Sequence, residues 1–325
     1  MKRRDALSGL LIVCAAPRSF AQGARKATVA VLLPNPETDV ESLRRRATFT
    51  SRLEKLGWRD GHNLRLELRH AVGDAQLAHQ AGELAALNPD VMLIQSNQAL
   101  AIAREQGIAI PIVFVAVSDP VGSGFVASLA RPSGNITGFT NFEPGTGGKW
   151  LQILKDLAPR IESVAMLLNT TIAANRELAR SVESAAASLG IATTVVTAID
   201  AAALEQAIAV LPGELRSGMV VLPNPTNALY QRQIIDSAAR RRLPTIYPFA
   251  YFARSGGLAA YGVDINEMFG QAAAYVDRIL RGTKAGELPV QQPTKYELVI
   301  NLRIARSLGL NVPGSLLARA DEVIE

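Results

Sequence analysis

The sequence predicts an α/β protein of two similar lobes in series, each with a parallel sheet covered by helices. Beyond Gln22, short β-branched runs alternate with longer amphipathic segments, and this alternation is interrupted once and then restarts. A mature chain of about 300 residues also exceeds what one ordinary core accommodates, which favours two domains.

The first half predicts four strands and three helices. Gly57, the pair Asn88-Pro89 and Gly107 end the three helices, because glycine and proline do not readily continue a helix. The strands are expected at 27–33, 64–70, 91–95 and 111–117, and the helices at 40–56, 76–87 and 99–106.

The interruption spans residues 119–148, which are crowded with Gly, Pro, Ser and Asn. This stretch is too long for an ordinary connection, so we expect the chain to cross between domains here. The alternation then resumes, with helices expected at 149–157, 174–189, 202–211, 228–241 and 267–281 and strands at 163–168, 193–199, 218–222, 245–248 and 258–262.

The tail adds a strand at 297–301 and a short helix at 302–308. A strand this late would most simply return to the earlier sheet. Lobe 1 is therefore predicted to hold residues 27–140 and about 265–325, and lobe 2 residues 141–264. Several crossings between the lobes favour a hinge over a loose linker.

Residues 1–21 are typical of an export signal. Lys2, Arg3 and Arg4 precede an apolar run at 6–16, and small residues at 19 and 21 suit signal peptidase. The run is shorter than the ~20 apolar residues that a membrane span requires. We therefore expect a mature protein that is exported to the periplasm and is soluble there.

The same segment bears on lipid attachment and on the export route. Cys14 is the only cysteine, and Val13 before it stands where a lipoprotein signal has a small residue, so lipid attachment is disfavoured. Arg3-Arg4 followed by Leu7 resembles a twin-arginine signal, which leaves both the general and the twin-arginine routes open.

Charge argues against nucleic acid as a partner. The first 21 residues hold four of the 34 Lys and Arg and one of the 29 acids, which leaves 30 against 28 and a net charge of +2. Phosphate neutralisation needs a concentrated basic face. The two tight basic runs, 44–46 and 240–242, are interpreted as solvated helix faces.

Metal and catalytic motifs are not found. His62, His70 and His79 lack paired ligand spacing, so no metal and no cofactor are expected. The glycines at 122 and 124 imitate a dinucleotide motif only weakly, and Trp150 stands where a phosphate loop needs Ser or Thr. Without a Gly-x-Ser-x-Gly elbow a hydrolase is not indicated, and the protein is not predicted to be an enzyme.

Small polar residues follow most of the predicted strands, where ligands of open parallel sheets bind. Capping of the next helix explains such residues equally well. Asp119 and Asp264 could supply a carboxylate to a ligand ammonium group, and Tyr247 and Tyr261 could stack on an apolar or aromatic moiety, with core packing as the alternative for both tyrosines. These runs lie at 34–36, 96–98, 118–120, 169–171, 224–226, 247–249 and 261–264.

Several segments together form a pattern that covers nearly the whole mature chain: residues 111–114, 118–122, 129–138, 243–249, 256–258, 261–264, 291–295 and 320–324. These segments resemble the solute-binding proteins of a bacterial ABC-uptake family, some of which are similar to tryptophan-uptake binding proteins. The resemblance implies the type I periplasmic binding fold, with two Rossmann-like lobes joined by three crossings.

The family pattern implies ligand contacts at the strand ends. Residues 224–226 and Ser133 depart from common family residues, so the pocket need not match that of relatives. With the two tyrosines, the implied ligand-binding residues are Ser96, Asn97, Asp119, Asn141, Asn169, Asn224, Thr226, Tyr247, Tyr261 and Asp264.

The resemblance favours an exported solute-binding component of an ABC transporter that delivers a small molecule to a membrane permease. An amino acid or aromatic compound is the preferred ligand, with peptides and sugars open, and a monomer or weak dimer is expected. A periplasmic sensor using the same clamp is the alternative. An enzyme with Asp119 and Asp264 as an acid and base pair is disfavoured, and a repressor would need DNA-reading helices where the export signal stands.

Overall fold

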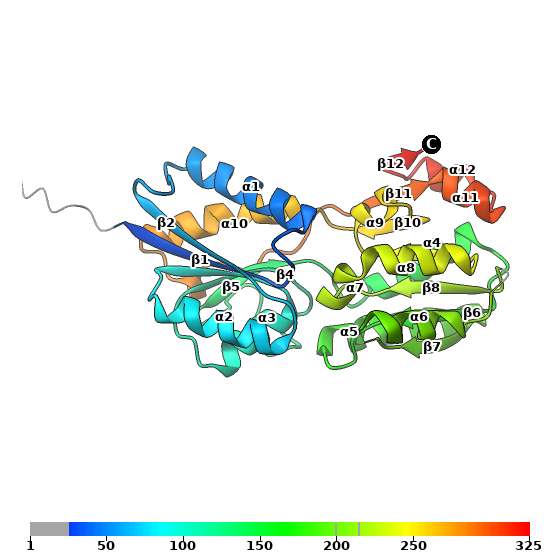
Figure 1. The fold of residues 1–325 in the computed structure, drawn as a ribbon, viewed down its shortest axis with the longest axis horizontal. Helices are drawn as coiled ribbons and strands as arrows, with labels where there is room; N and C mark the ends of the chain where they lie inside the picture. The colour runs from blue at the N-terminus through cyan, green and yellow to red at the C-terminus, as the bar shows by residue number, and fades with distance from the viewer. Residues whose placement is uncertain (1–25, 199, 214) are drawn as a thin grey trace, which may run out of the picture.

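The computed structural model describes residues 26–325 except 199 and 214, so the expected export signal at 1–21 lies outside the described residues. Two α/β lobes lie side by side along the long axis of the molecule (Figure 1). Each lobe holds a sheet of mainly parallel strands covered by helices. The predicted fold class is confirmed.

Lobe 1 contains a five-stranded parallel sheet in the order β2-β1-β3-β4-β5. Helices α1 (Val40–Lys55) and α10 (Ile265–Leu280) pack against each other on one face, and α2 (Asp74–Ala86) and α3 (Asn97–Glu105) cover the other. The strands are β1 (Ala27–Leu33), β2 (Leu64–His70), β3 (Val91–Gln95), β4 (Ile112–Val117) and β5 (Ile136–Thr140).

Burial on both faces explains why the central strands of lobe 1 are almost continuously apolar. In β1, Val29, Val31 and Leu33 pack toward α1 and α10, whereas Ala30 and Leu32 pack toward α2 and α3. Successive side chains of a strand point to opposite faces, so one run of residues feeds two cores. This packing on both faces fixes the position of the strands, and with it the position of their carboxyl ends.

Lobe 2 contains a seven-stranded sheet in the order β12-β11-β10-β9-β8-β6-β7, in which only the β10–β11 pair is antiparallel. The strands are β6 (Ser163–Leu167), β7 (Ala192–Val196), β8 (Ser217–Val221), β9 (Thr245–Tyr247), β10 (Ala259–Gly262), β11 (Glu297–Asn301) and β12 (Glu322–Ile324). The helices are α4 (Thr146–Leu157), α5 (Ala173–Leu189), α6 (Ala201–Ala209), α7 (Pro225–Leu229), α8 (Gln231–Arg240), α9 (Ala250–Arg254), α11 (Leu302–Leu308) and α12 (Gly314–Leu317). The short 3₁₀ turn η1 (Ala285–Glu287) packs instead against β5 of lobe 1.

The tail differs from the expected return to lobe 1. Helix α10 does pack on the first sheet, but β11 and β12 extend the second sheet beyond β10. β11 pairs with β10, so the backbone groups at the edge of β10 gain hydrogen-bond partners. The side chains of Leu298, Val299 and Ile300 are buried in the cores on the two faces of the lobe 2 sheet. The expected boundary at about 265–325 is therefore too long: residues from 297 onward belong to lobe 2.

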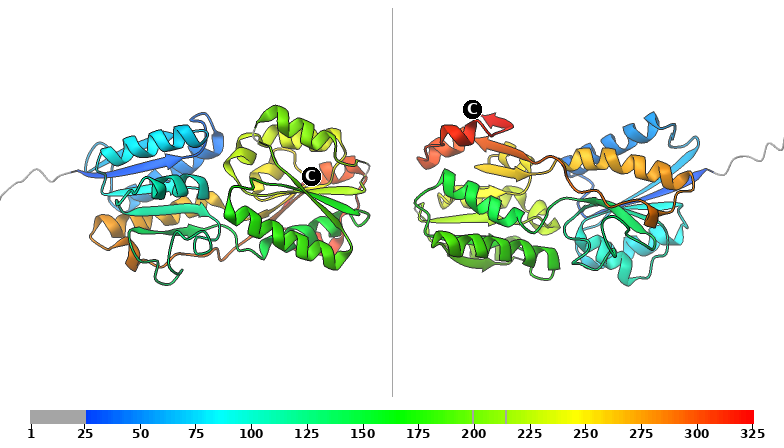
Figure 2. Two further views of the ribbon diagram at one scale, coloured as in Figure 1. Left: turned by 90° about the horizontal axis from the view of Figure 1, so that it is seen from below. Right: turned by 180° about the vertical axis from the view of Figure 1, so that it is seen from behind.

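Three crossings join the lobes: after β5, after β10 and before β11. The first and third run together, since Thr140 N–H donates to the Gln291 carbonyl at 2.9 Å and Gln291 N–H donates to the Gly138 carbonyl at 2.9 Å. Figure 2 shows these thin segments between the two bodies. The connection is thus a short paired strip rather than a free linker.

Several local elements differ from the sequence prediction. The segment at 119–148 contains β5, which is buried throughout, and the single helix expected at 228–241 is two helices that meet at Tyr230. Helix α9 and strand β12 were not predicted, because each is too short to show a clear periodicity. Strand β7 ends at Val196, and residue 199, where that strand was expected to end, lies outside the described residues.

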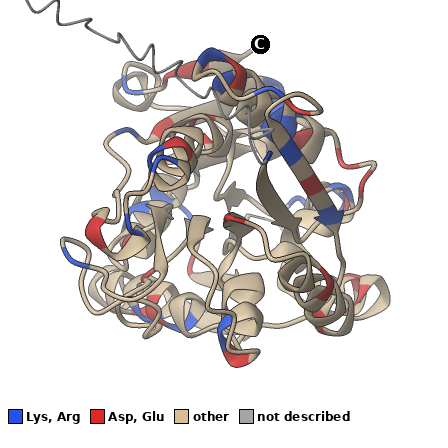
Figure 3. Cartoon of the chain, turned by 90° about the vertical axis from the view of Figure 1, so that its left-hand side faces the viewer, with Lys and Arg blue, Asp and Glu red and all other residues tan. Residues whose placement is uncertain are grey.

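Within the described residues, no helix is long and apolar enough to cross a membrane. Figure 3 shows Lys and Arg scattered among Asp and Glu over the outer helices and loops of the face in view. The described ion pairs lie mostly between exposed side chains, which contribute little to stability.

Candidate ligand-binding site between the lobes

A cavity lies between the two lobes, and we call it the interlobe cleft. Lobe 1 lines it with Pro34, Asn35, Arg45, Gln95, Ser96, Asn97 and Ala116. Lobe 2 lines it with Ile172, Pro223, Asn224, Pro225, Ala228, Phe249 and Tyr251, and the crossings add Asn141 and Ile265. A molecule in this cleft would contact both lobes and two of the three crossings.

The carboxyl ends of the parallel strands build the lobe 1 wall. Asn35 follows β1, Gln95 ends β3 and Ala116 lies near the end of β4, and these strands are neighbours in the sheet. Ligands of open parallel sheets bind at this end, because the strand-to-helix loops converge there. The first sheet therefore positions one half of the cleft directly.

Three buried polar atoms in the cleft lack a hydrogen-bond partner. They are Asn35 Oδ1, Arg45 Nε and Gln95 Oε1, and they make up half of the six such side-chain atoms among the described residues. A buried polar atom without a partner is costly, and in a ligand site the ligand supplies that partner. Their gathering in one cavity indicates a polar ligand.

Arg45 comes from the buried face of α1, which it shares with Ser42, Phe49 and Leu53. Its side chain is only 4% exposed, and no carboxylate of the described residues forms an ion pair with it. Its guanidinium carbon lies 5.9 Å from the centre of the Tyr251 ring, which belongs to lobe 2. A buried cation thus faces the cleft against an aromatic ring of the other lobe.

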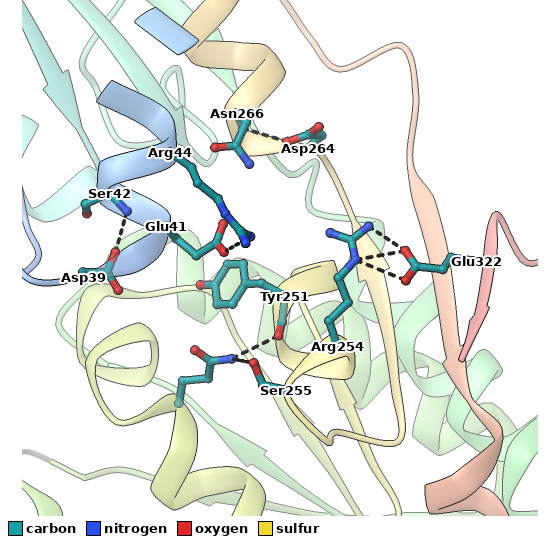
Figure 4. Close-up of polar contacts among 11 residues, drawn as sticks. Asp39, Glu41, Ser42, Arg44, Tyr251, Arg254, Ser255, Asp264, Asn266 and Glu322 are labelled. Carbon is teal, nitrogen blue, oxygen red and sulfur yellow. Dashed lines mark hydrogen bonds and ion pairs between the residues drawn. The ribbon is translucent and has the colours of Figure 1, made fainter. Parts of the chain in front are cut away.

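Tyr251 stands on α9 and points toward the first turn of α1 (Figure 4). Its ring stacks between Phe249 at 5.5 Å and Phe252 at 4.9 Å, and its carbonyl accepts a hydrogen bond from Gln231. Burial raises the pKa of Tyr251 above its ordinary value, and the nearby Arg45 opposes this rise. The phenol therefore stays protonated at neutral pH and can donate a hydrogen bond.

Two cleft residues have left-handed backbone conformations. Ser96 has φ 86° and Ala116 has φ 55°, values that non-glycine residues seldom adopt. Ala116 also marks a register shift between β4 and β5, at the position of a β-bulge. Such strain persists where the surrounding structure enforces it and often gathers at functional sites.

A family model described as ABC transporter substrate binding protein matches residues 29–324 of this chain. The chain belongs to this family. A tyrosine-binding protein of Clostridioides difficile is 24% identical over 271 residues, which cover 81% of this chain and 75% of that protein. The resemblance predicted from the sequence is confirmed.

Solved structures show the same fold. A conserved domain protein of Vibrio cholerae has a TM-score of 0.85 at 28% identity, covering 92% of this chain and all of that chain. An ABC domain from Streptococcus pneumonia in complex with L-Trp has a TM-score of 0.82 at 19% identity, with the same coverage of both chains. The two-lobed architecture of this substrate-binding protein is therefore shared with these proteins.

Four of the ten predicted site residues line the interlobe cleft: Ser96, Asn97, Asn141 and Asn224. Three of them chiefly satisfy the protein's own backbone. Ser96 and Asn224 cap α3 and α7, and Asn97 exchanges two hydrogen bonds with the backbone of Ser118. The capping role considered from the sequence is present in the structure, alongside a place in the cleft wall.

Both predicted carboxylates lie outside the cleft lining. Asp119 accepts a hydrogen bond from the Gly122 N–H at 2.9 Å, and Asp264 caps α10 by accepting from Asn266 N–H at 2.8 Å. Figure 4 shows Asp264 turned to its own helix end. No described Asp or Glu lines the cleft. The two residues are not brought together as an acid and base pair in this cavity.

The remaining predicted residues also lie outside the cleft lining. Tyr247 is buried in the lobe 2 core against Phe252, and Tyr261 stacks on Tyr296 at 5.4 Å. Asn169 accepts hydrogen bonds from the backbone and hydroxyl of its neighbour two residues on, and Thr226 lines a small hollow at the cleft rim.

Asn35, Arg45, Gln95 and Tyr251 line the cleft but are not among the ten predicted site residues. Asn35 lies in the polar run at 34–36, and Gln95 lies inside the predicted strand at 91–95. Arg45 belongs to a basic run expected to be exposed, yet it shares the apolar spacing of Phe49 on α1, and this helical period is the signal that identifies it. Tyr251 lies on a helix too short to predict.

A larger hollow lies along α10 and the third crossing. Its lining includes Asp264, Glu267, Arg278, Lys295 and Glu297, and none of the buried unpartnered side-chain atoms of the described residues lies in it. Unlike the interlobe cleft, this hollow therefore offers no unpartnered buried group that a ligand would satisfy. The described residues also form no cluster of three or more His, Cys, Asp or Glu suited to a metal ion.

Proposed function

We propose that this substrate-binding protein closes its two lobes around a free amino acid with an aromatic or large apolar side chain. The observation that carries the proposal is the interlobe cleft, whose lining combines residues of lobe 1 that have buried polar atoms without partners with apolar residues of lobe 2. Closure would bury the ligand between them, as in clamp-like binding proteins.

The two ends of the cleft suit the two ends of such a ligand. Asn35, Arg45 and Gln95 form a polar end on lobe 1, and Ile172, Phe249 and Tyr251 supply apolar and aromatic surface on lobe 2. Pockets of this kind combine a mostly apolar lining with a few placed polar groups. A tyrosine-binding relative and a similar structure that holds L-Trp favour an aromatic amino acid.

Delivery rather than chemistry is the proposed role. The described lining offers no Asp, Glu, His, Cys or Lys side chain to act as a general acid or base. The export signal expected at 1–21 and the family of the chain support a periplasmic protein that passes its ligand to the permease of an ABC transporter.

Calorimetric titration of the chain from Gln22 onward tests the proposal. L-tryptophan, L-tyrosine, L-leucine, galactose and a dipeptide would be compared, and we expect selective binding of an aromatic amino acid. Ala228→Phe would fill the cleft and abolish binding, whereas Ala187→Phe, on the exposed face of α5, would not. No binding of any amino acid, or binding that Ala228→Phe leaves intact, would contradict the proposal.

Uptake assays in a strain that lacks this protein test the transport role separately. Loss of uptake of the ligand identified by titration, restored by the wild-type chain and not by Ala228→Phe, is the expected result. Unchanged uptake together with a lost cellular response would favour a sensor.

A further inference from the structure

We propose that Arg45 binds the carboxylate of the ligand and that the side-chain oxygens of Asn35 and Gln95 accept hydrogen bonds from its ammonium group. The ligand class is then the zwitterionic α-amino acid, recognised without any acidic residue of the protein. This inference rests on the proposed function and assigns the polar end of the same cleft.

The burial of Arg45 carries the first half of the inference. A guanidinium that is 4% exposed has lost most of its hydration, and Arg45 faces the Tyr251 ring with no ion pair to a described carboxylate. Its Nε is buried without a partner, and its side chain lines the cleft. A carboxylate fits this need, because the planar guanidinium can donate two parallel hydrogen bonds to its two oxygens.

The composition of the lining restricts the charge of the ligand. Arg45 is the only ionised side chain in the described lining of the cleft. A ligand with a lone ammonium group would face this cation with no carboxylate to offset it, and at short range like charges repel strongly in a poorly hydrated cavity. An amine should therefore bind far less well than the corresponding amino acid.

Asn35 and Gln95 supply the second half of the inference. Asn35 Oδ1 and Gln95 Oε1 are buried acceptors without donors, and they come from the ends of β1 and β3, which pair side by side. The carbonyl of Asn35 lies 3.1 Å from His70 Nδ1, which helps fix its backbone. An ammonium group has three N–H donors, so it can satisfy both oxygens at once.

The position of Arg45 also links the ligand to both lobes. Arg45 stands on lobe 1, and the ring it faces, Tyr251, stands on lobe 2. A carboxylate bound to Arg45 would therefore lie beside the phenol of the opposite lobe. Recognition of the carboxylate would then favour the closed arrangement of the lobes.

Titration with three related compounds tests the inference. L-tryptophan carries both charged groups, tryptamine lacks the carboxylate, and indole-3-propionate lacks the ammonium. In the wild type we expect tryptamine to bind at least ~30-fold more weakly than L-tryptophan, a typical loss when one partner of a buried charge pair is removed. Because this comparison uses the unaltered protein, it does not depend on the folding of a variant.

Two variants assign the groups. Arg45→Gln should weaken L-tryptophan and indole-3-propionate by ~30-fold or more, and it should strengthen tryptamine binding because the repelling cation is removed. Gln95→Met, similar in shape but without the amide, should weaken L-tryptophan and tryptamine and spare indole-3-propionate. Arg46→Gln, on the exposed face of the same helix, should leave all three affinities unchanged.

The outcomes separate this inference from the proposed function. Equal affinity of the wild type for tryptamine and L-tryptophan, or an equal loss for all three compounds in Arg45→Gln, would overturn the role of Arg45 and leave the clamp intact. A wild type that binds galactose but no indole compound and no L-tyrosine would overturn both this inference and the amino-acid ligand. A chain that binds none of these compounds would overturn the clamp as well.

Discussion

Polar side chains around the interlobe cleft fall into two kinds. Ser96, Asn97 and Asn224 hold the ends of helices and strands in place, with hydrogen bonds inside the protein. Asn35, Arg45 and Gln95 each have a buried polar atom without a hydrogen-bond partner. The first kind shapes the wall, and the second provides the groups that a ligand can satisfy.

Asp119 belongs to the first kind, although it lies outside the cleft lining. Its carboxylate accepts the Gly122 N–H, and its φ of 42° is tolerated by Asp and Asn better than by Ala. We expect Asp119→Ala to lower the free energy of unfolding by ~1–2 kcal/mol, while Asp119→Asn stays near the wild type. Urea denaturation measures both changes.

Ligand affinity provides the matching control for Asp119. Both variants should bind L-tryptophan within ~twofold of the wild type, a difference of about 0.4 kcal/mol. A selective loss of affinity in Asp119→Asn, with unchanged stability, would instead place this carboxylate at the ligand.

Tyr247 makes stability depend on alkaline pH. Burial raises the pKa of Tyr247 above its ordinary value of 10.0, so the folded state keeps the proton after the unfolded state releases it. The stabilisation is fully present below pH 10 and is lost as the pH rises further. We expect the urea midpoint to fall between pH 10 and 11.

Tyr247→Phe tests this assignment. The variant loses only the buried hydroxyl and keeps the ring, so its stability should decline less steeply above pH 10 than that of the wild type. A decline as steep as in the wild type would show that other groups, such as Tyr251, account for it.

At the scale of elements, the strip that joins the lobes depends on close backbone approach. β5 lies against β4, and the third crossing pairs with the end of β5 through Gln291. A Cβ built on Gly138 would overlap the backbone of Phe114, and Gly138 has φ 155°. Only glycine fits there, so the first crossing starts from a fixed position.

Gly138→Ala should therefore destabilise the protein by ~2 kcal/mol or more, because backbone or neighbouring strands must shift. Gly145→Ala is the matched control, since Gly145 has φ −63° and nothing within 4 Å of the added methyl group. Thermal unfolding of the two variants is the measurement. Similar melting temperatures would mean that the strip adapts easily.

The whole molecule combines two lobes, each with its own sheet, with a short connection of three crossings. Each lobe has cores on both faces of its sheet, and the cleft lies where the lobes meet. Aromatic residues pack at this connection, where Phe142 contacts Trp150 and Phe249, and Trp150 donates to the Tyr261 carbonyl at 2.7 Å. Motion between the lobes should be a bend at the crossings rather than a rearrangement within a lobe.

Small-angle X-ray scattering tests this motion. We expect saturating L-tryptophan to lower the radius of gyration of the wild type, because closure brings the lobes together. Ala228→Phe, with its cleft filled, should show no change on addition of L-tryptophan. An unchanged radius in a wild type shown by calorimetry to be saturated would mean that binding occurs without closure.

The sequence by itself determined the alternation of strands and helices, the two lobes and the family. These depend on local periodicity and on segments that can be read one after another, such as the apolar strands β1, β3 and β4. It also predicted a site at the carboxyl ends of the strands, and four of the residues predicted there line the interlobe cleft.

Only the tertiary structure decided which side chains are left without partners. Whether Arg45 lies in solvent or in the cleft depends on the packing of α1 against α10, and whether Asp119 faces a ligand depends on the turn that captures it. The position of β11 likewise depends on the edge strand β10 of the lobe 2 sheet, with which it pairs. Such outcomes arise from contacts between residues distant in the chain, which local pattern does not encode.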